Sequence, residues 1–111
     1  MMLGSRDMTV IPDSILEEVA RRFALLGDPT RLRVVRALHD QGESSVQAVA
    51  AVVGISPANA SQHLIRLREG AIVTRRRAGK SVRYQIADPT IEALCRTVCD
   101  SVEQRLRTLS A

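Results

Sequence analysis

From Ser56 to Gly70 the chain reads SPANASQHLIRLREG, and both ends of a short helix are marked in this stretch. Ser56 can cap the first free backbone amides, and Pro57 suits the first helical position because its missing N–H would have no partner there. Gly70 is expected to end the helix in the left-handed conformation. The stretch therefore predicts a helix that begins at Pro57 and ends beside Gly70.

The two sides of this predicted helix differ in chemistry. Ala60, Leu64 and Leu67 recur at helical spacing and form an apolar side that can pack on a core. The other side is small, polar and without acid, so it can lie against base edges and phosphates without repulsion. With the cap residue included, the expected DNA contacts of this helix are Ser56, Ala58, Asn59, Ser61, Gln62, His63 and Arg66.

Three more helices are predicted upstream. The first opens at Pro12-Asp13-Ser14 with Asp13 or Ser14 as its cap, and Gly27 closes it. The second runs from Asp28-Pro29 to Gly42, and a short third begins near Ser44 or Ser45 and ends at Gly54. The turn Gly54-Ile55-Ser56 then joins two helices as a helix-turn-helix. The first helix is expected to bury Leu16, Val19, Ala20, Phe23 and Leu26.

After Gly70 the pattern changes from helical to strand-like. Residues 71–77 and 81–86 read as two strands, and Ala78-Gly79-Lys80 reads as the turn between them. Such a hairpin, or wing, beside a recognition helix can grip the DNA backbone near the minor groove. Because side chains alternate along a strand, only about half of its cations can face DNA at once. We expect contacts from Arg75, Arg77, Lys80 and Arg83, above all from Arg77 and Lys80 near the tip.

Charge is concentrated in the same part of the chain. The formal net charge is +4, but residues 57–86 hold seven cations and one acid, a local +6, so the rest carries −2. A basic half on a nearly neutral body is typical of a protein that binds a polyanion. The alternative is a solvated surface that happens to be basic.

Asp88-Pro89 opens a last helix that is predicted to reach about Leu109. Its apolar stripe is longer than so small a body can bury, which indicates a partner surface, most simply a second copy of the chain. The alternative is a core helix within one chain. The predicted dimer interface combines this stripe with the first helix and comprises Leu16, Val19, Phe23, Ile91, Leu94, Cys95, Val98, Val102 and Leu106.

At 111 residues the chain is long enough for one domain. We expect a flexible tail over residues 1–12 and a single winged-helix domain over residues 13–110. The predicted fold is mainly α with a small β-hairpin, in the order α-α-α-α-β-β-α. No stretch is apolar enough to span a membrane, and the start lacks the apolar core of a secretory signal, so a cytoplasmic location is expected. Nor does the sequence show a catalytic constellation, so an enzyme is not expected.

These motifs resemble the ArsR/SmtB family of bacterial repressors from about Leu16 to Leu109. The most specific pieces are ALLGDPTRLR at residues 24–33, SQHL at 61–64 and GKSVRY at 79–84. The resemblance implies a homodimeric winged-helix repressor that binds a palindromic operator on double-stranded DNA. It also implies dimerisation through the first and last helices, and release of the operator when an inducer binds.

The family's sensing motifs are absent. Where many members carry a cysteine pair, residues 45–50 read SVQAVA without a thiol. Where others place metal ligands on the last helix, this chain has Asp88-Pro89-Thr90, then Ser101 and Gln104. Asp88 is already explained as a helix cap. Neither metal site of the family can therefore be carried over.

Cys95 and Cys99 are the remaining candidates for sensing. They lie one helical turn apart, so they could chelate a soft metal or metalloid ion such as arsenite, or form disulfides between subunits under oxidation. Alternatively, both are small hydrophobes of the apolar stripe. His39 and His63 have no ligand near them in the sequence. A chain without an inducer site of its own, needing a partner subunit to sense, stays open, as does a winged-helix protein-interaction module.

Overall fold

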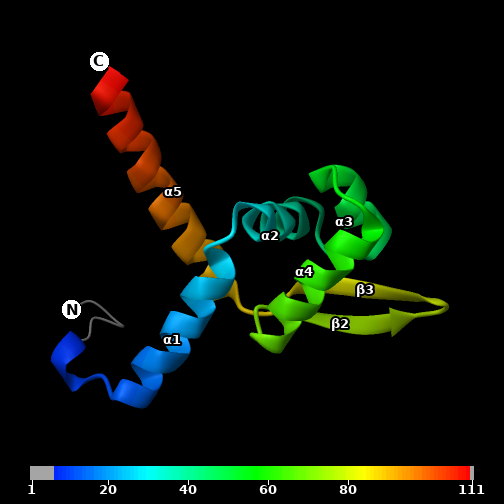
Figure 1. Ribbon diagram of the computed structural model, residues 1–111, viewed down its shortest axis with the longest axis horizontal. Helices are drawn as coiled ribbons and strands as arrows, with labels where there is room; N and C mark the ends of the chain where they lie inside the picture. The colour runs from blue at the N-terminus through cyan, green and yellow to red at the C-terminus, as the bar shows by residue number, and fades with distance from the viewer. Residues whose placement is uncertain (1–6, 111) are drawn as a thin grey trace.

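Five α-helices and a three-stranded antiparallel sheet make up residues 7–110, which the computed structural model describes (Figure 1). The order confirms the predicted winged helix-turn-helix, with a 3₁₀ turn and a two-residue strand that the sequence did not indicate. The elements are η1 (Met8–Val10), α1 (Asp13–Leu26), α2 (Pro29–Gln41), β1 (Ser44–Ser45), α3 (Val46–Val53), α4 (Pro57–Glu69), β2 (Val73–Ala78), β3 (Ser81–Ile86) and α5 (Pro89–Ser110).

Most helix boundaries follow from local capping. The side chain of Asp28 accepts from the backbone N–H of Arg31 at 2.9 Å, and that of Ser45 accepts from Ala48 at 3.1 Å. Gly54 ends α3 in the left-handed conformation, with φ 81°. These contacts confirm the predicted starts of α2 and α3 and the predicted end of α3.

Helix α4 ends beside Gly70 as predicted, but two details of the predicted helix ends were wrong. Pro12 is the N-cap of α1 and makes no side-chain cap, so Asp13 is already helical and can only favour the positive helix end electrostatically. Gly70 has φ −84°, and Ala71 takes the positive φ of 60° instead. Glycine at position 70 leaves room for a neighbouring side chain. A Cβ there would lie 2.2 Å from Cδ1 of Leu25, on α1.

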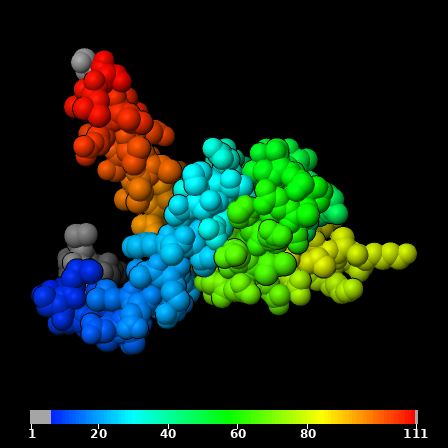
Figure 2. Space-filling model, in the orientation of Figure 1, coloured from blue at the N-terminus to red at the C-terminus, as the bar shows by residue number. Residues whose placement is uncertain are grey.

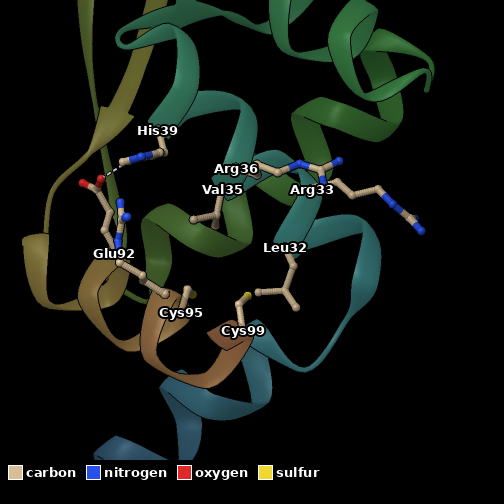
Figure 3. Close-up of a pocket in the computed structure, with 9 residues that line it drawn as sticks. Leu32, Arg33, Val35, Arg36, His39, Glu92, Cys95 and Cys99 are labelled. Carbon is tan, nitrogen blue, oxygen red and sulfur yellow. Dashed lines mark hydrogen bonds and ion pairs between the residues drawn. The ribbon is translucent and has the colours of Figure 1, made fainter. Parts of the chain in front are cut away.

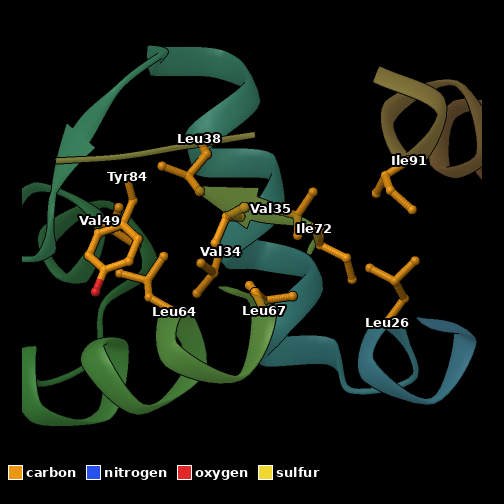
Figure 4. Close-up of a cluster of buried hydrophobic side chains, with 11 residues drawn as sticks. Leu26, Val34, Val35, Leu38, Val49, Leu64, Leu67, Ile72, Tyr84 and Ile91 are labelled. Atoms are coloured by element: carbon orange, nitrogen blue, oxygen red, sulfur yellow. The ribbon is translucent and has the colours of Figure 1, made fainter. Parts of the chain in front are cut away.

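The core lies between α2, α3 and α4 on one side and the sheet on the other (Figure 4). Leu64, Leu67 and Ile72 are fully buried. The helices at the two ends of the chain contribute little, because α1 places only Leu26 in the core and α5 places only Ile91 there. The buried cluster is completed by Val34, Val35, Leu38, Val49, Val73 and Tyr84.

Of the predicted buried stripe of α1, only Leu26 is buried within the single chain. Leu16, Val19 and Phe23 are 36%, 38% and 54% exposed, and Ala20 is exposed as well. The reason is visible in Figure 1, where α1 lies beside the body and only its C-terminal end meets α2. The space-filling view shows α5 standing away from the rest of the molecule in the same manner (Figure 2).

Half of the expected N-terminal tail, residues 1–6, lies outside the described residues. In the other half, Met8–Val10 form the 3₁₀ turn, which is capped by the Asp7 side chain through the backbone N–H of Thr9 at 2.9 Å. No helix within residues 7–110 combines the length and the apolar character that a membrane crossing needs.

Candidate nucleic-acid interface

Helix α4 presents its two sides as the sequence predicts. Ser56 caps it by accepting from the backbone N–H of Asn59 at 3.1 Å, and Pro57 occupies the first turn. The apolar side is fully buried, which fixes the rotation of the helix. The opposite side therefore points outward, with Ala58, Asn59, Gln62 and Arg66 exposed and Ser61 half-buried.

His63 is less exposed than most of the other predicted DNA contacts of α4. Its side chain is half-buried, and its Nδ1 is a buried atom without a hydrogen-bond partner among the described residues. The ring lies near Asp28 at the start of α2. The Arg31 backbone N–H, with smaller effects of the Arg31 and His63 charges, holds the pKa of the Asp28 carboxyl below its ordinary value. One nitrogen of His63 thus faces the protein rather than DNA.

The register of the wing sorts its arginines onto two faces. Arg75 pairs with Tyr84 and Arg77 with Val82, so these two arginines share the face that carries the buried Tyr84. Arg76 pairs with Arg83 on the opposite face. Arg75 and Arg77 therefore lie on the side of the sheet that α4 packs against, and Arg83 does not.

The second face of the wing is tied to the body. Arg76 donates two hydrogen bonds to the carboxylate of Glu43, at 2.7 and 2.6 Å. The Arg76 guanidinium lowers the pKa of that carboxyl. The pair joins residues 33 positions apart, and the sequence carried no signal for it. It leaves Arg76 occupied, whereas Arg75 and Arg77 form no ion pair among the described residues.

The turn of the hairpin is shorter than predicted, because Ala78 belongs to β2 and only Gly79 and Lys80 connect the strands. Gly79 has φ 64°, which favours glycine at this tight turn. The exposed Lys80 therefore lies at the tip of the wing, which extends away from α1 and α5 (Figure 1).

The predicted dimer residues divide into two groups. Ile91 is only 4% exposed and packs in the core of its own chain, and Leu94 and Cys95 are half-buried against that core. Ile91 therefore has almost no surface left for a partner, and Leu94 and Cys95 have only part of theirs. Further along α5, Val98, Val102, Leu106 and Leu109 are 50–72% exposed, so the available apolar surface on this helix begins at Val98.

Both cysteines are free thiols on the first half of α5, with Cys95 half-buried and Cys99 exposed. Burial, together with the neighbouring Cys99, raises the pKa of Cys95. His39 of α2 pairs through Nδ1 with Glu92 of α5, a contact across 53 positions that the sequence did not predict. Within residues 7–110, no group of three or more His, Cys, Asp or Glu side chains is placed to hold a metal ion.

The comparisons with known proteins agree with this geometry. A family model described as a helix-turn-helix domain matches residues 26–76. The "Transcriptional repressor SmtB homolog" of Synechocystis sp. is 36% identical over 79% of this chain and 66% of its own length. The "Probable mercury resistance operon repressor" of Streptomyces lividans is 33% identical over 84% of this chain and 74% of its own.

A solved structure extends the likeness to the whole fold. A homodimeric winged helix-turn-helix DNA-binding domain from Mycobacterium bovis, a fragment of residues 1–100, has a TM-score of 0.77 and 31% identity. The match covers 95% of this chain and 94% of that one. With the helix-turn-helix, the wing and two repressors above 30% identity, the chain belongs to the ArsR/SmtB family of winged-helix, DNA-binding transcriptional repressors.

Proposed function

We propose that this chain represses transcription as a homodimer that binds a palindromic operator. Helix α4 enters the major groove, while Arg75, Arg77 and Lys80 of the wing contact the neighbouring backbone. The observation that carries the proposal is the outward face of α4: Asn59 and Gln62 are exposed on a helix held by its buried opposite side. Both are amides, which can pair bidentately with adenine in the major groove.

Dimerisation is proposed because one α4 covers only one half-site. A two-fold pair of such helices reads two half-sites about one helical turn apart, ~34 Å. The exposed apolar residues of α1 and of α5 from Val98 onward provide the surface that would hold the two copies at that distance. We include a cytoplasmic location in the proposal, because a regulator of this bacterial family has to reach the DNA.

Base reading is tested on Gln62→Ala, with Gln104→Ala on α5 as a matched glutamine control outside the interface. Both variants are titrated on a palindromic fragment from upstream of the chain's own gene and on random DNA of equal length. We expect Gln62→Ala to lose about 1–3 kcal/mol on the operator and little on random DNA. Equal losses on both DNAs would contradict base reading by Gln62.

The same titration distinguishes DNA binding from the main alternative, a protein-interaction module. A winged helix that uses its basic face to bind an acidic protein would not show strong, salt-dependent binding to the operator or to random DNA. Absence of salt-dependent binding to the operator would overturn the proposed function as a whole.

We further propose that a soft metal or metalloid ion acts on the repressor through Cys95 and Cys99. The two thiols lie one turn apart on α5, the helix assigned to dimerisation, and thiolates are suited to such ions. One chain offers only this pair, so further ligands would come from the second copy or from solvent. Arsenite or Hg²⁺ should release wild-type protein from DNA and leave the Cys95→Ser/Cys99→Ser variant bound. Equal release of both would contradict a thiol site.

A further inference from the structure

A cavity of about 330 Å³ lies between α2 and the first half of α5 (Figure 3). One wall is apolar and comes from both helices: Leu32 and Val35 from α2, and Cys95 and Cys99 from α5. Val35 is only 4% exposed, whereas Leu32 is 41% exposed, so the cavity leaves apolar surface uncovered. Burial, together with the neighbouring Cys99, raises the pKa of Cys95, which favours the uncharged thiol at this wall.

Three arginines are among the residues that line the same cavity, and the side chains of Arg33 and Arg36 extend away from the two thiols (Figure 3). Arg33 and Arg36 come from α2, and Arg96 comes from α5. None of them takes part in the ion pairs formed within residues 7–110, in contrast to Arg22, which pairs with Asp88 at 2.7 Å.

The cavity lining also holds one acid. Glu92 is engaged by His39 at one end of the cavity (Figure 3). The lining is therefore net positive, and its arginines form no ion pair within residues 7–110.

We propose that this cavity binds a small organic carboxylate with an apolar body. The body would lie against the wall of Leu32, Val35 and the thiols, and the carboxylate would accept hydrogen bonds from the arginines. The size is at the lower end of small-molecule sites, and an apolar lining with a few charged groups is their usual chemistry. Arginine is suited to carboxylates because its donors match their two oxygens. An inorganic anion would leave the apolar wall uncovered.

A ligand in this position touches both the helix-turn-helix body and the dimerisation helix. Because α2 packs on α3 and α4, a carboxylate that binds better in one arrangement of α2 and α5 would shift the spacing of the two α4 helices. This consequence rests on the proposed function, whereas the binding itself does not.

Binding is tested on the full chain by calorimetry and by amide chemical shifts, with phenylacetate and octanoate as probes. Their alcohols, 2-phenylethanol and 1-octanol, serve as neutral controls of the same shape. We expect both carboxylates to bind at least about tenfold more tightly than the alcohols, since hydrogen bonds to charged groups are the stronger ones. The shifts should centre on Leu32, Val35 and Cys95.

Variants locate the charge recognition. Arg36→Gln/Arg96→Gln should weaken carboxylate binding about tenfold or more, and Arg105→Gln, an exposed arginine of α5 outside the cavity, should leave it unchanged. Equal binding of acids and alcohols, shifts elsewhere, or no binding at millimolar concentration would overturn the inference.

Operator titration of the same samples without any probe reports on the proposed function alone. Normal operator binding with no carboxylate binding would overturn only the carboxylate site. Carboxylate binding to a chain that does not bind the operator would support the site and overturn its role in DNA release.

Discussion

Replacing Val98 with Asp tests the dimer interface at the point where α5 leaves its own core. Val98 is 51% exposed in the single chain, so the substitution should leave the fold of each copy intact. In a dimer built on the α5 stripe, however, the new carboxylate would be buried against apolar surface. Removing it from water costs on the order of 3 kcal/mol or more.

Two-fold symmetry doubles this cost, because both copies carry the substitution. The penalty is then about 6 kcal/mol, which raises the dimer dissociation constant by roughly four orders of magnitude. A dimer that dissociates in the nanomolar range would dissociate near 10 µM, an order-of-magnitude figure from the same relation. Operator binding should fall with it, because a monomer covers only one half-site.

The assay is sedimentation of both proteins at about 1 µM, a concentration between those two dissociation constants. Circular dichroism checks that helical content is retained. Gln104→Glu is the matched control. It adds the same charge to α5, about 120° around the helix from Val98, and should stay dimeric. A Val98→Asp protein that remains dimeric would place the interface elsewhere and refute the reasoning.

Three further results are expected. Removing one phosphate contact should lower the slope of log K for DNA binding against log salt concentration by roughly 0.9. Arg77→Ala and Lys80→Ala should each show this change, and an unchanged slope in both would mean that the wing does not contact DNA. Gly70→Ala should destabilise the fold by about 1 kcal/mol, because its Cβ would overlap Leu25, and calorimetry should find almost no cost in a Leu25→Ala background. The hydrogen bonds from Thr90, with the nearby Arg22, hold the pKa of Asp88 below its ordinary value. The ionised Asp88 therefore stabilises the fold at pH values above the ordinary pKa, and this stabilisation is lost as pH falls through the lower pKa of the folded state. The stability gap between wild type and Asp88→Asn should therefore close in strong acid, and a constant gap would contradict the ionised cap.

Sequence reasoning succeeded where structure depends on neighbours in the chain. Asp28-Pro29 and Ser56-Pro57 specify helix starts because a cap side chain reaches a backbone N–H only three residues away. Helical spacing likewise predicted the buried side of α4, and with it the exposed amides that make this helix a candidate reading head. The strand-like pattern after Gly70 and the turn residues around Gly79 predicted the hairpin.

It failed where burial depends on which surface is nearby. Leu16, Val19 and Phe23 have the spacing of a core stripe, yet in the single chain they are exposed because α1 meets the body only at its end. Ile91 has the same apolar character as Val98, but it is buried in its own chain. Periodicity shows that a helix has an apolar side, and it cannot show whether that side meets its own chain or another.

The sequence by itself thus determined the order of elements, most helix ends and the chemistry of the candidate DNA-binding face, because these depend on contacts within a few residues. Tertiary structure alone decided which wing arginines are free, since Arg76 is occupied by Glu43 from a distant loop. It also brought Leu25 close to Gly70, and it brought α2 and α5 together around a cavity with three arginines among its lining residues. Such contacts join side chains tens of residues apart, and only the packing of the helices brings them within reach.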